Sequence, residues 1–349
     1  SLFHSPRDFI REPLVHRIGT SYHLPTGGAV YFDTGVIEVA TPVIEIERGC
    51  AARAGRSLWE AILFVRRELD AWEARAARSL RLVGFSTHYN VSFDVPLRPG
   101  PRRRIEELAL LAAYVVPVPV MLLAANRRST GVGVRPRGDR IEVTVDFTPV
   151  PELMIATGTF LVAALRGLMT WPSWGLDSLD RQRFPVIRGF RPVPHTTRHG
   201  WLANVGSFPR NPFTADIDHD LWETTGGEWL SLREIGGRIA RSFRPELRAL
   251  ADSLTLGLVQ SIVGGRGPSL LALEDRPPAY EDVGRACRWE NLFPERVLPR
   301  SRYERVLLRA VSGRPLRMFG RWYTPVGMRG WAQVVFRRPD GRRSTFPID

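Results

Sequence analysis

Two carboxylates interrupt an apolar stretch near the start of this sequence. Asp33 follows the apolar run 30–32, and Glu38 lies inside the apolar run 36–39. A carboxylate among apolar neighbours on a strand is costly unless it has a partner or a function. An ionised carboxylate can accept a proton, attack as a nucleophile or bind a cation. Asp33 and Glu38 are therefore candidates for chemistry.

Two further stretches have a polar residue at every second position. In 86–92 these residues are His88, Asn90 and Ser92, and in 141–147 they are Glu142, Thr144 and Asp146. Strand side chains alternate with a period of two, so each set shares one face. A sheet with one solvated face explains each strand taken alone. Three such strands on one sheet face would form a trough lined by carboxylates, histidine and asparagine, which suits Mg²⁺ and nucleotide phosphates.

Hydrophobic periodicity predicts the elements that position these residues. Strands are expected within 12–48, 81–93 and 132–147, and helices over 56–79, 105–115, 153–168, 231–263, 281–292 and 303–311. Residues 171–230, rich in Trp, Pro, Gly and Arg, predict a long irregular connection or lid. Residues 320–347 predict a small β-unit with a turn at Pro339-Asp340-Gly341. Without a regular βαβ rhythm, this order predicts an α+β fold with an antiparallel sheet.

Composition limits the class of protein. A chain of 349 residues that is 44% hydrophobic can bury a sizeable core. Its two cysteines, Cys50 and Cys287, form neither a zinc set nor a disulfide framework, so we expect a cytoplasmic protein. Charged residues and prolines interrupt the apolar runs, so we expect no membrane span, and no export signal is recognised. The net charge of +13 indicates either compositional bias toward arginine or an anionic partner.

The motifs, in this order, resemble the Pup ligase and depupylase family, within the glutamine synthetase and glutamate-cysteine ligase superfamily. Tyr31-Phe32-Asp33 followed by 37–42 is similar to the family's tyrosine-valine-aspartate and its later proline-glutamate-tyrosine motif. Residues 84–90 are similar to its glycine-x-histidine-x-asparagine stretch. Residues 24–29, 140–160, 285–291 and 316–347 resemble further segments, so the resemblance covers most of the chain.

The resemblance implies a curved, mainly antiparallel sheet of glutamine synthetase type with helices on its convex face, over residues 1–280. A small β-containing domain would follow over 281–349. It also implies ATP and Mg²⁺ as cofactors and a small acidic, Pup-like modifier or a peptide as partner. The implied roles are catalysis for Asp33, metal binding for Glu38 and Glu142, and nucleotide binding for His88, Asn90, Arg135, Arg140 and Trp289.

This sequence also departs from the family pattern. The family's metal-binding glutamate-x-glutamate pair is missing, although Ser1–Pro6 resembles the segment that follows it, so preceding residues could supply the pair. The segment before Arg140 is shorter than in the family, which leaves Arg135, Arg137 and Arg140 as substitutes for a phosphate-binding arginine. Two alternatives therefore stay open: a non-catalytic homologue acting as a binding or scaffolding subunit, and a basic nucleic-acid-binding protein. Ligation and amide hydrolysis are not distinguished.

Overall fold

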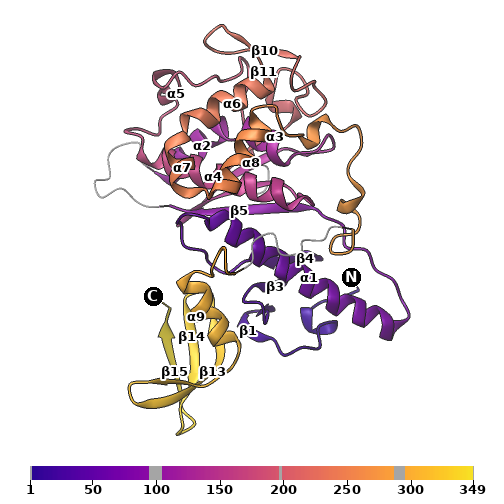
Figure 1. Cartoon of the computed structure of the whole chain (residues 1–349), viewed down its shortest axis with the longest axis vertical. Coiled ribbons are helices and arrows are strands. Elements are labelled where there is room, and N and C mark those ends of the chain that lie inside the picture. The colour runs from indigo at the N-terminus through magenta and orange to yellow at the C-terminus, as the bar shows by residue number, and fades with distance from the viewer. Residues whose placement is uncertain (1, 94–103, 196–198, 287–294, 349) are drawn as a thin grey trace. The chain divides into compact units, whose positions relative to one another are not determined.

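The computed structural model describes residues 2–93, 104–195, 199–286 and 295–348 (Figure 1). The chain forms two compact units. Unit 1 comprises Ser1–Ile46, Ala52–Leu82 and Asp282–Asp349, and unit 2 comprises Glu47–Ala51 and Val83–Glu281. The chain returns to unit 1 at Asp282. The C-terminal segment joins the same unit as the N-terminal residues.

Unit 1 contains two four-stranded antiparallel sheets, of order β1-β2-β3-β4 and β12-β13-β14-β15. The strands are β1 (Val15–Ile18), β2 (Ser21–His23), β3 (Ala29–Asp33), β4 (Val36–Ala40), β12 (Leu316–Met318), β13 (Arg321–Arg329), β14 (Gln333–Arg337) and β15 (Arg343–Pro347). Its α-helices are α9 (Arg302–Val311) and α1 (Cys50–Ala76) without its first two residues.

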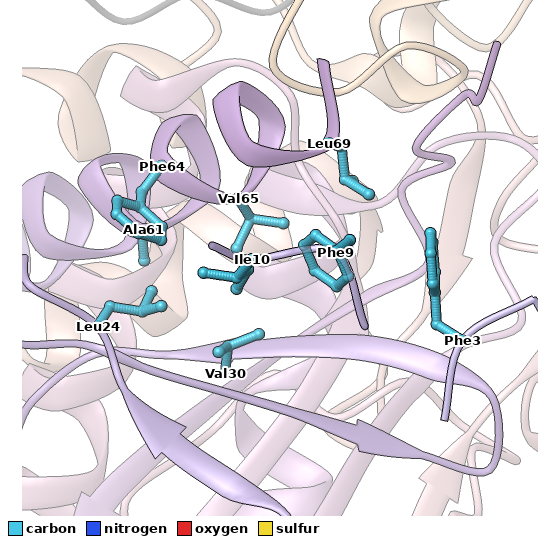
Figure 2. Close-up of a cluster of buried hydrophobic side chains, with 9 residues drawn as sticks. All are labelled: Phe3, Phe9, Ile10, Leu24, Val30, Ala61, Phe64, Val65 and Leu69. Carbon is cyan, nitrogen blue, oxygen red and sulfur yellow. The ribbon is translucent and has the colours of Figure 1, made fainter. Parts of the chain in front are cut away.

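The core of the first sheet follows from strand alternation. Val30 is fully buried and Phe32 and Ile37 pack with it, because this face of β3 and β4 lies against α1. Figure 2 shows the arrangement, with α1 side chains on one side, Val30 and Leu24 on the other, and Phe9 and Ile10 between them. The polar residues of β3 and β4 must therefore lie on the opposite face.

A tight hairpin joins β3 to β4. Thr34 and Gly35 have φ angles of 48° and 86°, as a type I′ turn requires, and this turn matches the twist of the flanking strands. Tyr31 pairs with Glu38, and Asp33 pairs with Val36. Directly opposite residues share a face. The turn therefore places Asp33 and Glu38 on the same face of the sheet.

Unit 2 contains a five-stranded antiparallel sheet of order β5-β7-β6-β9-β8 and the hairpin β10-β11. The strands are β5 (Ser86–Ser92), β6 (Val132–Arg137), β7 (Arg140–Asp146), β8 (Val193–Pro194), β9 (Trp201–Ala203), β10 (Leu221–Glu223) and β11 (Trp229–Ser231). The helices are α2 (Ile105–Val115), α3 (Pro117–Ala124), α4 (Pro151–Thr170), α5 (Asp177–Arg181), α6 (Leu232–Ser242), α7 (Arg244–Leu250) and α8 (Ser253–Val263).

The mixed architecture with antiparallel sheets is as predicted, but the assignment of strands to sheets is corrected. β3 and β4 belong to a different hydrogen-bonded sheet from β5, β6 and β7. The expectation that Asp33, Glu38 and His88 share one sheet face is therefore wrong. Pairing between distant segments depends on tertiary packing, which local periodicity does not encode.

Three element predictions also need correction. Residues 171–230 are not simply a connection, because they contain α5, the β10 strand and β9, which extends the five-stranded sheet beside β6. The predicted helix 231–263 is divided into α6, α7 and α8. Pro245 near the start of α7 and the Asp252 side chain, which caps α8, mark the breaks. Residues 281–286 form turns rather than a helix, and 287–294 lie outside the described residues.

Helix α4 is longer than predicted, because it extends from Pro151 to Thr170 instead of over 153–168. An 18-residue window of this 20-residue helix has a mean hydropathy of 1.6, enough by length and composition to cross a membrane, and 83% of that window is buried within the fold. The apolar pair α2 and α3 passes the same test only as a pair bent by 58°. Buried core helices of soluble proteins share this composition, and α4 contacts α3, α7 and α8.

The β3–β4 hairpin predicts a stabilising substitution. A β-branched residue with positive φ costs about 1–2 kcal/mol, whereas asparagine tolerates this conformation. Thr34→Asn should therefore raise the free energy of unfolding by about 0.5–1 kcal/mol in urea denaturation. Thr345→Asn, at an exposed position of β15, is the matched control and should not stabilise. A destabilised Thr34→Asn protein would contradict the turn geometry.

Candidate functional site

One face of the unit 2 sheet collects most of the polar residues selected from the sequence. In β5 and β7, His88 lies opposite Thr144 and Asn90 lies opposite Glu142. In β6, Arg135 lies opposite Glu142. Because opposite residues share a face, the sheet has a common polar face, here called the unit 2 polar face. Its members are Ser86, His88, Asn90, Ser92, Arg135, Arg137, Arg140, Glu142, Thr144 and Asp146.

The other face of the same strands is apolar. Ile141, Val143 and Val134 are fully buried, and β6 and β7 contact α2 and α3 on this side. Tyr89 also points this way, and its hydroxyl donates to the carbonyl oxygen of Met154 in α4 at 3.4 Å. Helices therefore cover one face of the sheet, and alternation directs the charged side chains to the other.

Glu142 is the electrostatic centre of the polar face. Its side chain is almost fully buried and forms ion pairs with Arg135 and Arg137. Arg137 Nε donates to Oε2 at 3.1 Å and Nη2 donates to Oε1 at 3.3 Å, which makes the contact bidentate. Burial alone would raise the pKa of Glu142, but the hydrogen bond from Arg137 and the two positive charges outweigh it, so the pKa lies below its ordinary value.

Arg140 is the most exposed of the three arginines on the face. Its Nε donates to Oδ1 of Asn90 at 2.9 Å, and its Nη1 donates to Asp139 at 2.7 Å. Its side chain is 43% exposed. Three of the predicted residues, Asn90, Arg140 and Glu142, thus lie at neighbouring positions of β5 and β7. His88 lies on the same face, where its charge when protonated would lower the pKa of Glu142 further.

Asp146 marks the end of the face, and the resemblance assigned it no role. The backbone NH and side-chain NH₂ of Asn126 donate to its Oδ2 at 3.1 and 3.0 Å. Burial nevertheless raises the pKa of Asp146, and the charge of Arg276 opposes that shift only in part. The alternation 142, 144, 146 contained the signal for Asp146. Arg276 comes from a distant loop that no sequence pattern indicated.

A second polar face belongs to the first sheet of unit 1. Asp33 and Glu38 share it with Tyr31 and with the fully buried His23. Burial raises the pKa of Tyr31, and its hydrogen bond to Glu38 raises it further. Asp33 accepts a hydrogen bond from the Thr34 hydroxyl at 3.0 Å. Asp33 is exposed and Glu38 is half-buried. The catalytic role suggested for Asp33 and the metal-binding role suggested for Glu38 remain predictions.

The described part of the chain contains no preformed cluster of metal-ligating side chains. In ranges 2–93, 104–195, 199–286 and 295–348, no cluster of three or more His, Cys, Asp or Glu side chains could hold a metal. Glu142 does not favour a cation, because two guanidinium groups already occupy its oxygens. The same face suits an anion better, since it contains three arginines, Arg135, Arg137 and Arg140, and two carboxylates, Glu142 and Asp146.

Two shallow hollows in unit 2 lie away from this face. One is lined by Glu107, Leu110 and Trp174 with the residues that follow it, and the other by Trp171, Arg181 and their neighbours. Neither includes a residue of the unit 2 polar face. Trp289, which the resemblance suggested for nucleotide binding, lies outside the described residues.

No family model matches the sequence, and no curated protein matches it. Among solved structures, the chain is similar to the Pup ligase PafA of the prokaryotic ubiquitin-like modification pathway in complex with ADP. The TM-score is 0.48 at 11% sequence identity, and the match covers 94% of this chain and 86% of that chain. So low a similarity does not by itself assign a function.

His23 predicts a specific pH dependence of stability. Burial lowers its pKa from 6.5 to about 4, although a hydrogen bond between its Nε2 and the Gly330 carbonyl opposes the shift. The unfolded chain binds a proton near pH 6.5 and the folded chain only near pH 4, so stability falls as the pH drops through this window. The loss should reach about 3 kcal/mol at most.

His23→Gln removes the titrating group and keeps a donor for the Gly330 carbonyl. The variant should lose less stability than the parent between pH 7 and pH 4 in urea denaturation. His219→Gln, at an 85% exposed histidine in unit 2, is the control and should follow the parent. Parallel pH profiles for the parent and His23→Gln would show that His23 does not titrate in this window.

Proposed function

We propose that this chain is a nucleotide-binding protein of the carboxylate-amine ligase type, similar to Pup ligase and depupylase. One observation carries the proposal. His88, Asn90, Arg135, Arg140 and Glu142, selected from the sequence, lie on one face of one antiparallel sheet whose other face is buried under helices. The excess of guanidinium groups on that face suits the phosphates of a nucleotide.

In this proposal each residue has a distinct role. Arg140 contacts a phosphate, because its guanidinium is partly exposed and is held by Asn90 and Asp139. Glu142 positions Arg135 and Arg137 rather than binding metal. When bound, ATP would supply the phosphoryl group that activates a carboxylate. Asp33, at the exposed end of β3, would accept the proton of an incoming amine or activate water. Glu38 remains the proposed metal ligand of the family pattern.

The substrate in this proposal is a carboxylate of a small acidic, Pup-like modifier or of a peptide, and the compartment is the cytoplasm. A second candidate is a non-catalytic homologue that binds nucleotide or partner without turnover. The observation that favours it is Glu142, because its bonds to two arginines leave that carboxylate poorly suited to a cation.

Nucleotide binding by the unit 2 polar face can be tested with Arg140→Gln. Losing one charged hydrogen-bond donor to phosphate should weaken ADP binding about 10- to 100-fold in isothermal titration calorimetry. Arg238→Gln is a matched control in unit 2, because Arg238 is 39% exposed and paired with Glu228. It should bind ADP like the parent. Equal ADP binding by the parent and Arg140→Gln would exclude this face as the phosphate site.

Catalysis can be tested separately with Asp33→Asn. The amide keeps the shape of the side chain and loses its basicity, so turnover should fall at least about 100-fold while ADP binding is unchanged. Phosphate release from ATP, with a glutamate-rich modifier present and with or without a lysine acceptor, measures turnover. Full activity in Asp33→Asn would refute the catalytic role. ADP binding without turnover in the parent would instead favour the non-catalytic homologue.

A further inference from the structure

The sheet β12–β15 of unit 1 has one buried face and one face in solvent. Tyr323, Val334 and Phe336 are buried and pack with Leu307 and Val311 of α9. α9 therefore covers one side of the sheet. Because strand side chains alternate, the residues between these core positions point to the other side.

Strand register brings one tryptophan and three arginines together on the outward face. Arg317 lies opposite Trp322 across β12 and β13. Two residues further along β13, Thr324 lies opposite Arg337, which in turn lies opposite Arg343 of β15. The side chains of Arg317, Trp322, Arg337 and Arg343 are thus neighbours on one surface, here called the C-terminal arginine patch. Trp322 is 59% exposed, and the three arginines are exposed.

The position of these arginines is more informative than their number. All 49 basic residues of the chain are arginine, so an abundance of arginine is compositional. Residues 312–348, however, contain eight arginines and one acidic residue, Asp340, a net +7 of the chain's +13. The four strands of this sheet contain no Asp or Glu. Within the described residues, no carboxylate forms an ion pair with an arginine of the patch.

We propose that the C-terminal arginine patch binds single-stranded nucleic acid. Guanidinium groups bind phosphate oxygens through paired hydrogen bonds, and an exposed indole provides a flat surface on which an unpaired base can stack. Open antiparallel sheets with exposed aromatic rings are a recurrent platform for such ligands. An acidic polypeptide could pair its carboxylates with the arginines. A carboxylate, however, gains nothing from contact with the ring of Trp322. A duplex keeps its bases stacked within the helix, away from the ring.

The test uses the full chain and a fluorescein-labelled 20-nucleotide oligodeoxythymidylate, followed by fluorescence anisotropy from 50 to 300 mM salt. The parent should bind, with affinity falling as salt rises by about 0.7 in log–log slope per phosphate contact. Trp322→Ala should weaken binding roughly 5- to 150-fold, the equivalent of about 1–3 kcal/mol per stacked base, and leave the salt slope unchanged. The double variant Arg317→Gln/Arg343→Gln should weaken binding and lower the slope by about 1.4.

The control is Arg302→Gln/Arg309→Gln, which removes the same charge from exposed positions of α9. It should bind the oligonucleotide nearly as well as the parent, and circular dichroism should show all variants folded. The proposal is overturned if the parent fails to bind at 50 mM salt, or if the two double variants weaken binding equally. It is also overturned if poly-glutamate displaces the probe at lower concentration than unlabelled oligonucleotide does, which would assign the patch to an acidic polypeptide.

Discussion

A carboxylate removed from water needs a counter-charge, and in unit 2 that requirement centres on Glu142. Taking one ion out of water costs several kcal/mol, and leaving a buried partner unpaired costs about 3–5 kcal/mol. Arg135 and Arg137 together meet this requirement. A guanidinium has five N–H donors, so two of them offer far more donors than one carboxylate can accept. The pairing therefore fixes two rigid cations in place, and Arg137, whose side chain is 37% exposed, can still meet a further anion. This face therefore suits a phosphate better than a metal ion.

The positions of the charged side chains on the unit 2 polar face depend on the apolar side chains of the same strands. A slip of one residue in β7 would turn Ile141 and Val143 toward solvent and Glu142 toward the helices, so burial of the apolar side chains fixes the register of the charged ones. Gly200 contributes from outside the strands. A Cβ there would lie 2.6 Å from the Val134 carbonyl oxygen and 3.0 Å from Cα of Arg135, so glycine is what allows this segment to lie against Arg135. Its φ of 132° also favours glycine.

Local patterns in the sequence predicted the strands and their polar faces but not which strands share a sheet. Strict alternation in 86–92 and 141–147 predicted strands and their polar faces, and the spacing of Asp33 and Glu38 suits a two-residue turn. The turn at Gly138-Asp139 also implies that Arg135 lies opposite Glu142, a consequence that the sequence contained and the metal-ligand prediction overlooked. Sheet membership could not be predicted in this way, because it depends on contacts between distant segments. The three-residue strand β9 is too short to show any periodicity.

The two arginine-rich surfaces differ in a way that decides what each can bind. Arg135 is 5% exposed and paired, whereas Arg317, Arg337 and Arg343 are exposed. Exposed charges are screened over about 8 Å at physiological ionic strength, while buried pairs are screened much less. A small anion on the unit 2 polar face makes few contacts, so its binding should change little with salt. A ligand of the C-terminal arginine patch should be long, since several weak, screened contacts must act together to give useful affinity. Salt dependence thus separates the two surfaces even in a protein that binds both kinds of ligand.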